Sequence, residues 1–331
     1  MEEKISVCIP VYNGAETIRE TINSVLSQTY KSFELLIVDN ASKDNTVKII
    51  KSINDPRIVL FINKENIGCG GNLEACKRKA KGDILFYLSA DDIAEIHALE
   101  KVVDAFNLSE KIGIVARSYF WFTDDPCMPV RTTKQFNKNK VVSIHSSLED
   151  IKDLISLSDQ ISGIAFRKKY MKYSFENKYF IEMASAFVPM IKTSTAVILK
   201  DNIIAVRIGH NGASNKKVFY QSPLLSWYNL ICRSFPDNKY AKLKKYLISD
   251  FVANNYVGLV QIKNYGTWKQ LFREIYYLLK FRSKNLHTIK FWFFSLGTII
   301  IPRFFLKSLV PWYKDQINSK IISKISFRYK I

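Results

Sequence analysis

Short apolar runs alternate with amphipathic stretches along the first third of the chain. Continuous apolar runs of a few residues are typical of buried strands, and apolar residues three or four apart are typical of helices. The predicted strands span residues 5–11, 33–38, 58–62 and 84–88, and the predicted helices span residues 15–28, 44–53 and 73–80. Strands that alternate with helices in this way form βαβ units, so we predict an α/β fold with a mostly parallel sheet flanked by helices.

Polar residues follow the ends of three predicted strands. These pairs are Tyr12-Asn13, Asp39-Asn40 and Asp91-Asp92. In open α/β sheets, ligands bind beyond the carboxyl ends of the strands, so we expect these pairs to line one site. Two carboxylates at a strand end are costly without a counter-charge, and a hard cation that holds phosphate oxygens would supply one.

A glycine-rich stretch precedes the strand that carries these two carboxylates. Gly68, Gly70 and Gly71 predict a turn where backbone approaches a ligand closely. Gly82 follows the predicted helix, at a position that favours a residue with positive φ.

The sequence lacks the motifs of several common nucleotide-binding and zinc-binding sites. No GxGxxG follows the first strand, no GxxxxGK[ST] is present, and the four histidines have no zinc-binding spacing. The five cysteines form no CxxC pair and are odd in number, which indicates free thiols in a reducing compartment. Met1 leads directly into two glutamates and a strand, so we expect no signal peptide.

The net charge of +19 is unevenly distributed. Residues 1–110 hold 13 basic and 17 acidic side chains, a net of −4, so the remainder carries 36 against 13, a net of +23. A basic half predicts an anionic partner, either a membrane or a nucleic acid. The alternative is a solvated basic face.

Five stretches resemble the family 2 glycosyltransferases of GT-A fold. They are IPVYN, SVLSQTY, FELLIVDNASKDNT, NIGCGGN and GDILFYLSADD, and they cover residues 4–105 in the family's order. The resemblance implies a Rossmann-like GT-A sheet and inverting transfer from a nucleotide-diphosphate sugar, expected to be a UDP-sugar, with Mg2+ or Mn2+.

The resemblance also implies roles for individual residues. Asp39 would bind the base, and Asp91 would ligate the metal. The other residues expected around the donor are Pro10, Tyr12, Asn13, Glu16, Asn40, Asn66, Gly68, Asn72, Ser89 and Ala90. Ser89 departs from the family's DxD, which usually begins with aspartate. An alternative interpretation is that Asp91 and Asp92 cap a helix predicted at residues 97–106.

The sequence indicates the general base less clearly than it indicates the donor site. The family's Glu-Asp pair is expected about 20 residues beyond the strand predicted at residues 161–167, and this region holds a single acid, Glu182. An inverting displacement needs a carboxylate that takes the proton of the acceptor hydroxyl. Glu182 is our candidate and Asp159 is the reserve, while the alternative for Glu182 is an exposed helical glutamate. The polar loop at residues 210–214 is expected to close over the donor phosphates.

From residue 224 the chain is predicted to be helical, aromatic and basic. Residues 291–301 contain eleven uncharged residues, too few to span a bilayer, which needs about 20. Together with Trp312, Tyr313 and nearby lysines they predict a segment in the interface of an anionic membrane. The alternative is a helical hairpin packed on the catalytic domain or on a second subunit of a homo-oligomer. No nucleic-acid-binding module is present, so we expect no nucleic acid partner.

We therefore expect a GT-A catalytic domain at residues 1–220, with a nucleotide-sugar-binding half (1–110) and an acceptor half (111–220). Residues 221–331 would form a helical membrane-associating extension. The expected function is glycosyl transfer to a saccharide, linked to a polyprenyl diphosphate, in bacterial surface polysaccharide assembly. The enzyme would be cytoplasmic and peripheral on the inner face of the plasma membrane. The alternatives are a sugar-nucleotide-binding protein without turnover and a membrane adaptor.

Overall fold

A computed structural model describes residues 3–208, 216–306, 325 and 327–330, and these form two compact units. The first unit contains the described residues of Met1–Asn177, Glu182–Ile208 and Lys320–Ile331. The second contains those of Lys178–Ile181 and Gly209–Ser319. The division falls after Ile208 rather than at residue 220, and the last described residues belong to the first unit rather than to the helical extension.

An eight-stranded sheet forms the centre of the first unit, in the order β3-β2-β1-β4-β10-β6-β11-β9. Its strands are β1 (Ile5–Val11), β2 (Phe33–Asp39), β3 (Ile58–Ile62), β4 (Ile84–Tyr87), β6 (Ile112–Arg117), β9 (Lys140–Val142), β10 (Ile164–Arg167) and β11 (Thr195–Leu199). The four N-terminal strands run parallel to one another, and β10 runs antiparallel to both β4 and β6. The mostly parallel α/β sheet is thus confirmed.

A second, four-stranded sheet has the order β5-β12-β7-β8. Its strands are β5 (Ile93–Ala94), β7 (Phe120–Phe122), β8 (Arg131–Thr132) and β12 (Ile204–Arg207). Because β5 begins directly after Asp92, this sheet is attached to the turn that ends β4.

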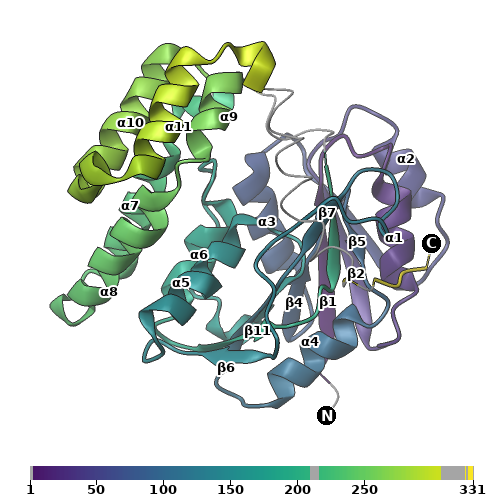
Figure 1. Ribbon diagram of the computed structural model, residues 1–331. Coiled ribbons are helices and arrows are strands. Elements are labelled where there is room, and N and C mark those ends of the chain that lie inside the picture. The colour runs from purple at the N-terminus through teal and green to yellow at the C-terminus, as the bar shows by residue number, and fades with distance from the viewer. Residues whose placement is uncertain (1–2, 209–215, 307–324, 326, 331) are drawn as a thin grey trace. The chain divides into compact units, whose positions relative to one another are not determined.

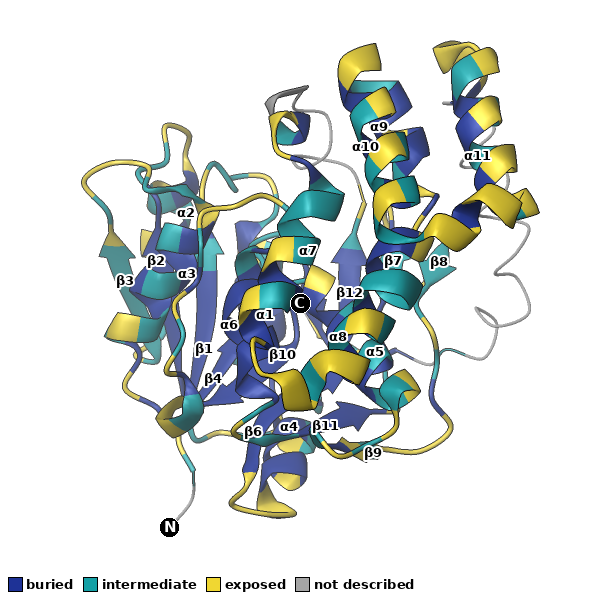
Figure 2. Ribbon diagram, turned by 90° about the vertical axis from the view of Figure 1, so that its left-hand side faces the viewer, coloured by how far each residue is buried: buried dark blue, intermediate teal, exposed yellow. Residues whose placement is uncertain are grey.

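Helices cover both faces of the large sheet (Figure 1). They are α1 (Ile18–Leu26), α2 (Thr46–Lys51), α3 (Gly68–Lys79), α4 (Ala98–Asn107), α5 (Leu148–Ser156) and α6 (Glu182–Met190). Ile5, Val7 and Ile9 of β1 pack in one core with residues of α1 and α4. Cys8, which alternates with them, interacts with Cys76 of α3. Burial on both faces explains why β1 is continuously apolar, and Figure 2 shows β1 in the colour of buried residues, whereas β3 at the edge of the sheet has the colour of intermediate residues.

The glycine-rich stretch differs from the prediction. It forms the first turn of α3, which begins at Gly68 rather than at residue 73. Among the described glycines, positive φ occurs at Gly68 and Gly163, so Gly82 is not the predicted cap. A Cβ at Gly82 would lie 2.6 Å from the Lys4 carbonyl oxygen. Gly82 therefore allows the chain to pass close to β1 rather than to take a left-handed conformation.

The second unit is helical, as predicted. Its helices are α7 (Pro223–Ser234), α8 (Ala241–Tyr246), α9 (Gly258–Tyr265), α10 (Trp268–Phe281) and α11 (Ile289–Ile300). Its core contains Tyr256, Leu259, Leu271, Leu278 and Phe291. No helix in the described part of the chain is long and apolar enough to cross a membrane.

Candidate functional site

The turn after β4 is held by hydrogen bonds to two other parts of the chain. The amide of Ser89 donates to Ser162 Oγ at 2.8 Å. The carbonyl of Ala90 accepts hydrogen bonds from Thr17 Oγ1 and Thr21 Oγ1, at 2.9 and 3.0 Å. The turn that presents Asp91 is therefore pre-formed by α1 and by the approach to β10.

Asp92 holds the same turn through its side chain. It is 1% exposed, and its carboxylate accepts hydrogen bonds from Ser162 Oγ and, at 2.9 Å, from the amide of Arg207. Burial, followed by the neighbouring charge of Asp91, raises the pKa of Asp92 well above its usual value. The predicted helix-capping role of the two acids is wrong, because β5 intervenes and α4 begins only at Ala98.

Arg207, which the sequence did not indicate, connects this turn to β12. Its Nε donates to the Asp91 carbonyl at 3.1 Å, and its guanidinium forms an ion pair with Glu20. The Asp92 carboxylate is thus occupied in positioning the turn, and the neighbouring Asp91 is half-buried.

Asp39 ends β2 with an unusual carboxylate. The residue is fully buried, and its Oδ2 accepts a hydrogen bond from the Ser42 amide at 3.0 Å. Its Oδ1 is buried without a hydrogen-bond partner among the described residues. A buried acceptor of this kind is costly unless a ligand donates to it, so the geometry supports the predicted role in recognising a nucleotide base.

The loop after β1 is built together with the loop after β2. Asn13 has a φ of 53°, its amide donates to Ser42 Oγ at 2.9 Å, and its Oδ1 accepts from the Lys43 amide at 2.8 Å. Asn13 thus supports the loop with both its backbone and its side chain. Pro10 is half-buried, whereas Tyr12 and Glu16 are exposed in the loop between β1 and α1.

Four asparagines form one network beside this edge. Asn40 Nδ2 donates to Asn66 Oδ1 at 2.9 Å and to the Gly68 carbonyl at 3.2 Å. Asn63 Nδ2 donates to Asn40 Oδ1 and to Asn72 Oδ1, both at 3.0 Å. Asn72 Nδ2 donates to the Val38 carbonyl at 2.9 Å, which joins α3 to β2. These carboxamides shape the loop around the site. Asn63 was not predicted, although it follows β3 as Asn40 follows the aspartate that ends β2.

Two glycines of α3 lie very close to residues 176 and 177. A Cβ at Gly70 would lie 2.3 Å from the Glu176 carbonyl oxygen, and one at Gly68 would lie 2.6 Å from Asn177 Oδ1. The predicted approach to a ligand at Gly70 is therefore wrong, because residues 176 and 177 occupy that space.

The two candidate bases lie in different surroundings. Glu182 is half-buried at the first residue of α6. It lies close enough to Cys69 that its charge, after the larger effect of desolvation by the surrounding protein, contributes to raising the pKa of that thiol.

Asp159 ends a short 3-10 turn and accepts a hydrogen bond from the Tyr119 hydroxyl at 3.0 Å. The surrounding protein raises the pKa of its carboxyl, and Tyr119, Arg117 and Arg131 oppose that shift. Arg117 is fully buried and also interacts with Asp92. The structure thus connects Asp159, rather than Glu182, to the turn that carries Asp91.

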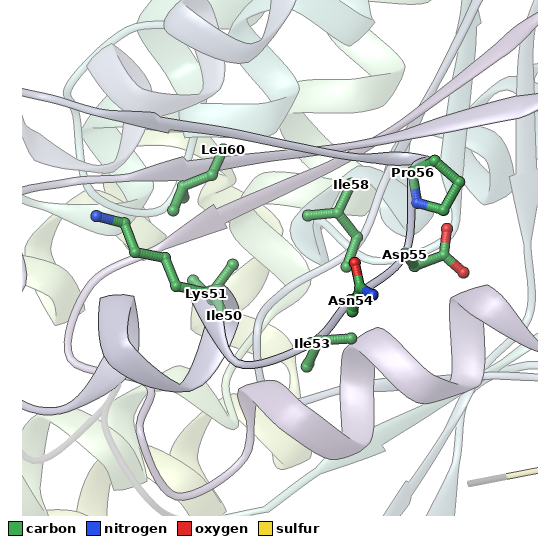
Figure 3. A pocket seen from close by; sticks show the side chains of 8 residues that line it. All are labelled: Ile50, Lys51, Ile53, Asn54, Asp55, Pro56, Ile58 and Leu60. Atoms are coloured by element: carbon green, nitrogen blue, oxygen red, sulfur yellow. The ribbon is translucent and has the colours of Figure 1, made fainter.

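A recess of about 290 Å³ lies elsewhere on the first unit (Figure 3). It is lined by Ile50, Lys51, Ile53, Asn54, Asp55, Pro56, Ile58 and Leu60. Ile58 is the first residue of β3, whereas Asp39 pairs with Ile62 at the other end of that strand. Four residues of strand separate these positions by about 13 Å, so this recess is not the expected ligand site.

The residues of this strand end could hold a divalent cation only if a bound ligand supplied further oxygen atoms to it. The described residues contain no group of three or more His, Cys, Asp or Glu side chains that could hold a metal by themselves. Mg2+ commonly binds through one or two carboxylates, several waters and the phosphates of a substrate. Asp91 satisfies this pattern as a single protein ligand, and Ser89 contributes no second carboxylate. The loop at residues 210–214 lies outside the described residues.

The last described residues return to this part of the chain. We call residues 325 and 327–330 the C-terminal strap. Phe327 is 7% exposed and packs on Ile93, Phe120, Phe122 and Ala205. The Arg328 carbonyl accepts a hydrogen bond from the Ile96 amide at 2.8 Å. The strap therefore supports β5, which follows the Asp91 turn, and β12, whose Arg207 bonds to that turn.

The family model for glycosyl transferase family 2 matches residues 6–173, which is more than half of the chain. The chain belongs to this family. The match includes Asp39, Asp91 and Asp159, whereas Glu182 lies beyond it. The resemblance seen in the sequence is thus confirmed.

Named relatives agree with the family. An uncharacterized glycosyltransferase of Rickettsia prowazekii is 40% identical over 116 residues, 35% of this chain and 36% of the relative. The matched stretch thus spans about a third of that relative's length. An uncharacterized glycosyltransferase of Haemophilus influenzae is 28% identical over 204 residues, 58% of this chain and 81% of the relative.

Solved structures share the GT-A fold. Staphylococcus aureus TarS (residues 1–349) in complex with UDP superposes with a TM-score of 0.64 at 15% identity, covering 97% of this chain and 90% of TarS. The mannosyltransferase PcManGT of Pyrobaculum calidifontis, in complex with GDP-Man and Mn2+, gives a TM-score of 0.54 at 14% identity, covering 96% and 88%. At these identities the likeness concerns the fold.

Proposed function

We propose that this family 2 member transfers a sugar, with inversion and with a divalent metal, from a nucleotide-diphosphate sugar to a saccharide acceptor. The observation that carries the proposal is the placement of Asp39 and Asp91. They follow β2 and β4, the two strands that flank β1 in parallel. Neighbouring strands lie about 4.8 Å apart, so the two strand ends are separated by roughly 10 Å. A nucleoside diphosphate laid across the end of β1 would bring its base to Asp39 and its diphosphate to Asp91.

The chemistry follows from the groups at this edge. The buried Oδ1 of Asp39 would accept a hydrogen bond from the base, and Asp91 would hold the metal. When bound, the metal neutralises the charge of the leaving diphosphate. Asp159 or Glu182 would take the proton of the acceptor hydroxyl as its oxygen bonds to the anomeric carbon. Attack from the face opposite the leaving group gives inversion.

We propose a UDP-sugar as the donor. Solved structures of the same fold hold UDP and UDP-GlcNAc, and uracil has an N–H donor that suits a buried carboxylate oxygen. The test is to incubate the full chain with UDP-, GDP- and dTDP-sugars and Mn2+ and to measure nucleoside diphosphate release. Release from UDP-sugars that depends on both the metal and Asp91 supports the proposal. Release without added metal, or from other nucleotides alone, contradicts it.

Ser89 favours a second candidate, a sugar-nucleotide-binding protein without turnover. The usual first aspartate of the DxD is replaced, and a single acid stands where the family's Glu-Asp pair is expected. The same assay separates the two candidates. UDP-sugar binding by calorimetry without UDP release, with acceptor saccharides present, would establish the second.

We further propose that the acceptor is linked to a polyprenyl diphosphate, and that the protein acts on the inner face of the plasma membrane in bacterial surface polysaccharide assembly. An apolar stripe on α11 supports membrane contact: Ile289, Phe293, Leu296 and Ile300 are between 47% and 88% exposed. Their spacing of three and four residues places them on one face of the helix. Exposed residues of α10 and α11 are visible in Figure 2. Lys290 is also exposed and suits an anionic lipid surface.

Membrane binding is tested by substitution rather than by truncation. Removal of the C-terminal residues would also remove the C-terminal strap from the catalytic unit. We expect Phe293→Asp combined with Ile300→Asp to reduce binding to phosphatidylglycerol vesicles while UDP release in solution is retained. Leu108→Asp alters a residue that is 62% exposed on the first unit and serves as the control. Equal vesicle binding by all these proteins, or none by the unchanged chain, would reject the membrane proposal.

A further inference from the structure

The strand ends that carry Asp39 and Asp91 belong to a longer row. The order of the large sheet continues from β2, β1 and β4 to β10 and β6. Because β10 runs antiparallel to both of its neighbours, it begins at the edge where β4 and β6 end. Asp159 lies five residues before β10, and Tyr119 lies two residues after β6. Both residues therefore follow Asp91 along this edge, on the side away from Asp39.

Asp159 is exposed to solvent and is nevertheless closely surrounded by protein. Desolvation by that protein is the largest effect on its carboxyl, and it raises the pKa of Asp159 above the usual value. A raised pKa makes a carboxylate a stronger base, and exposure allows a ligand to reach it. Asp159 thus combines two properties that a general base needs.

Tyr119 fixes one oxygen of this carboxylate. Its hydroxyl donates to Asp159 Oδ1 at 3.0 Å, and the residue is 2% exposed. Its ring packs edge to face on Trp121, with centroids 4.7 Å apart. Burial, followed by the charge of Asp159, raises the pKa of Tyr119 well above its usual value, so the hydroxyl keeps its proton and remains a donor. With Oδ1 of Asp159 held, the orientation of Oδ2 is fixed as well.

Arg117 fixes the 3-10 turn that precedes β10. It is fully buried, its Nη1 donates to the Leu157 carbonyl at 3.2 Å, and its Nη2 donates to the Gln160 carbonyl at 3.3 Å. Burial lowers the pKa of Arg117 to about 10, so the side chain is charged at neutral pH. That charge also interacts with Asp92, whose carboxylate holds the turn after β4. One buried side chain thus connects the two turns.

The charged groups that face Asp159 come from a few elements. Its hydrogen bond with Tyr119, the charge of Arg117, its own backbone amide and the charge of Arg131 in β8 all oppose the rise of its pKa. Two helices, α5 and α6, also pack on the turn that carries Asp159. After Glu182, α6 has no titratable side chain. The acidic side chains of α5 form ion pairs, which are Asp150 with Lys140, Asp153 with Lys134, and Glu149 with Lys152.

We propose that Tyr119 and Arg117 are positioning residues that make Asp159, rather than Glu182, the general base of the transfer. This deepens the proposed function and rests on it. The acceptor hydroxyl would meet Oδ2 of Asp159. As the hydroxyl oxygen bonds to the anomeric carbon, its proton passes to Oδ2. The bond between the anomeric carbon and the diphosphate oxygen breaks, and its electron pair leaves with the nucleoside diphosphate.

The test is the pH dependence of kcat for UDP release by the full chain with excess Mn2+. Water serves as the acceptor, and the donor is the UDP-sugar that the unchanged chain cleaves fastest. On the acid side, kcat falls as the base becomes protonated. Tyr119→Phe removes a hydrogen bond that favours the ionised carboxylate, so the pKa of Asp159 should rise and the acid limb should move to higher pH. We expect a shift of about one pH unit, at the low end for a hydrogen bond to a charged group because Asp159 is exposed.

A second variant tests the same carboxylate through its charge environment. Arg131→Gln removes a positive charge and should move the acid limb in the same direction by a smaller amount, whereas Arg131→Lys keeps the charge and should restore it. The control is Tyr87→Phe. Tyr87 is also fully buried, and its hydroxyl donates to the Leu73 carbonyl at 3.2 Å. Loss of this hydroxyl should leave the acid limb in place.

An acid limb that stays in place in Tyr119→Phe, or that moves equally in Tyr87→Phe, overturns the proposal. If Tyr119→Phe does not fold, an unmoved limb in Arg131→Gln has the same meaning. A kcat that falls about 10²- to 10⁴-fold in Glu182→Gln and not in Asp159→Asn also overturns it. Failure of the proposed function is recognised separately, because the unchanged chain would then release no UDP from any UDP-sugar, and the inference would fall with it.

Discussion

Phe327 is a residue whose replacement should alter catalysis from outside the site. Its ring meets that of Phe120 edge to face, with centroids 5.1 Å apart, in the cluster that contains Ile93 and Ala205. Ile93 directly follows Asp92, and Ala205 lies two residues before Arg207. We therefore expect Phe327→Ala to loosen β5 and β12, which hold the Asp91 turn in place.

The size of the effect follows from the contacts of the C-terminal strap. Phe→Ala at a buried position costs about 3–5 kcal/mol. Three described hydrogen bonds also fasten the strap, accepted by the carbonyls of Phe327, Arg328 and Lys330. The bonds from the Ser27 hydroxyl and the Ile96 amide contribute about 1 kcal/mol each, and the weaker bond from the Cys127 thiol contributes less. Loss of the ring thus removes half or more of the attachment, and a terminal segment can detach while the rest of the unit stays folded.

The assay is UDP release from a UDP-sugar as a function of Mn2+ concentration. Coupling between two sites is typically about 1–3 kcal/mol, so the Mn2+ concentration at half-maximal rate should rise about 5- to 100-fold. Phe327→Leu keeps most of the apolar volume and should restore the metal dependence. Phe136→Ala removes a similarly buried ring, 9% exposed, outside the strap cluster and controls for general destabilisation. The reasoning is refuted if Phe327→Ala folds with unchanged metal dependence, or if Phe136→Ala produces the same shift.

Three further predictions test the site directly. Asp91→Ala should abolish most UDP release, and added Mn2+ should not rescue Asp91→Asn; near-normal turnover in Asp91→Ala would reject the metal-ligand assignment. Asp39→Ala removes the buried acceptor for a base donor, at about 1–3 kcal/mol, and should weaken UDP binding about 10- to 100-fold by calorimetry. An unchanged affinity would reject the base-recognition role. Replacement of the true general base should lower kcat about 10²- to 10⁴-fold with little change in UDP affinity. A comparison of Glu182→Gln with Asp159→Asn in acceptor-dependent transfer identifies it, and full activity in both would exclude both.

The strands of the nucleotide-binding half could be predicted because each is a local feature. The predicted limits of β1 and β3 agree with the structure, since an uninterrupted apolar run marks a strand both at the centre of the sheet, where β1 is buried, and at its edge, where β3 is half-buried. The edge position of Asp39 and Asp91 also followed from the sequence, because the carboxyl ends of parallel strands meet at the same edge. The orphaned oxygen of Asp39 appeared only in the structure, since burial depends on the loops that cover it.

Features that depend on distant partners could not be predicted. Gly82 was assigned to a helix cap because the cap is a local pattern, but its neighbours are Lys4 and Ser6 of another part of the chain. Asn63 joins a network whose members come from the loops after β2 and β3 and from α3.

The sequence alone determined which residues can form strands, which end them and what chemistry those ends carry. The tertiary structure decided how the residues are used. Asp92 is bonded to Arg207, 115 positions away, and Ser27 to Lys330, 303 positions away. Apolar periodicity acts over a few neighbouring residues, whereas the partner of a carboxylate or of a terminal phenylalanine is chosen by packing that only the complete fold creates. The Asp91 turn is therefore predictable as a motif, while the residues that hold it in place are not.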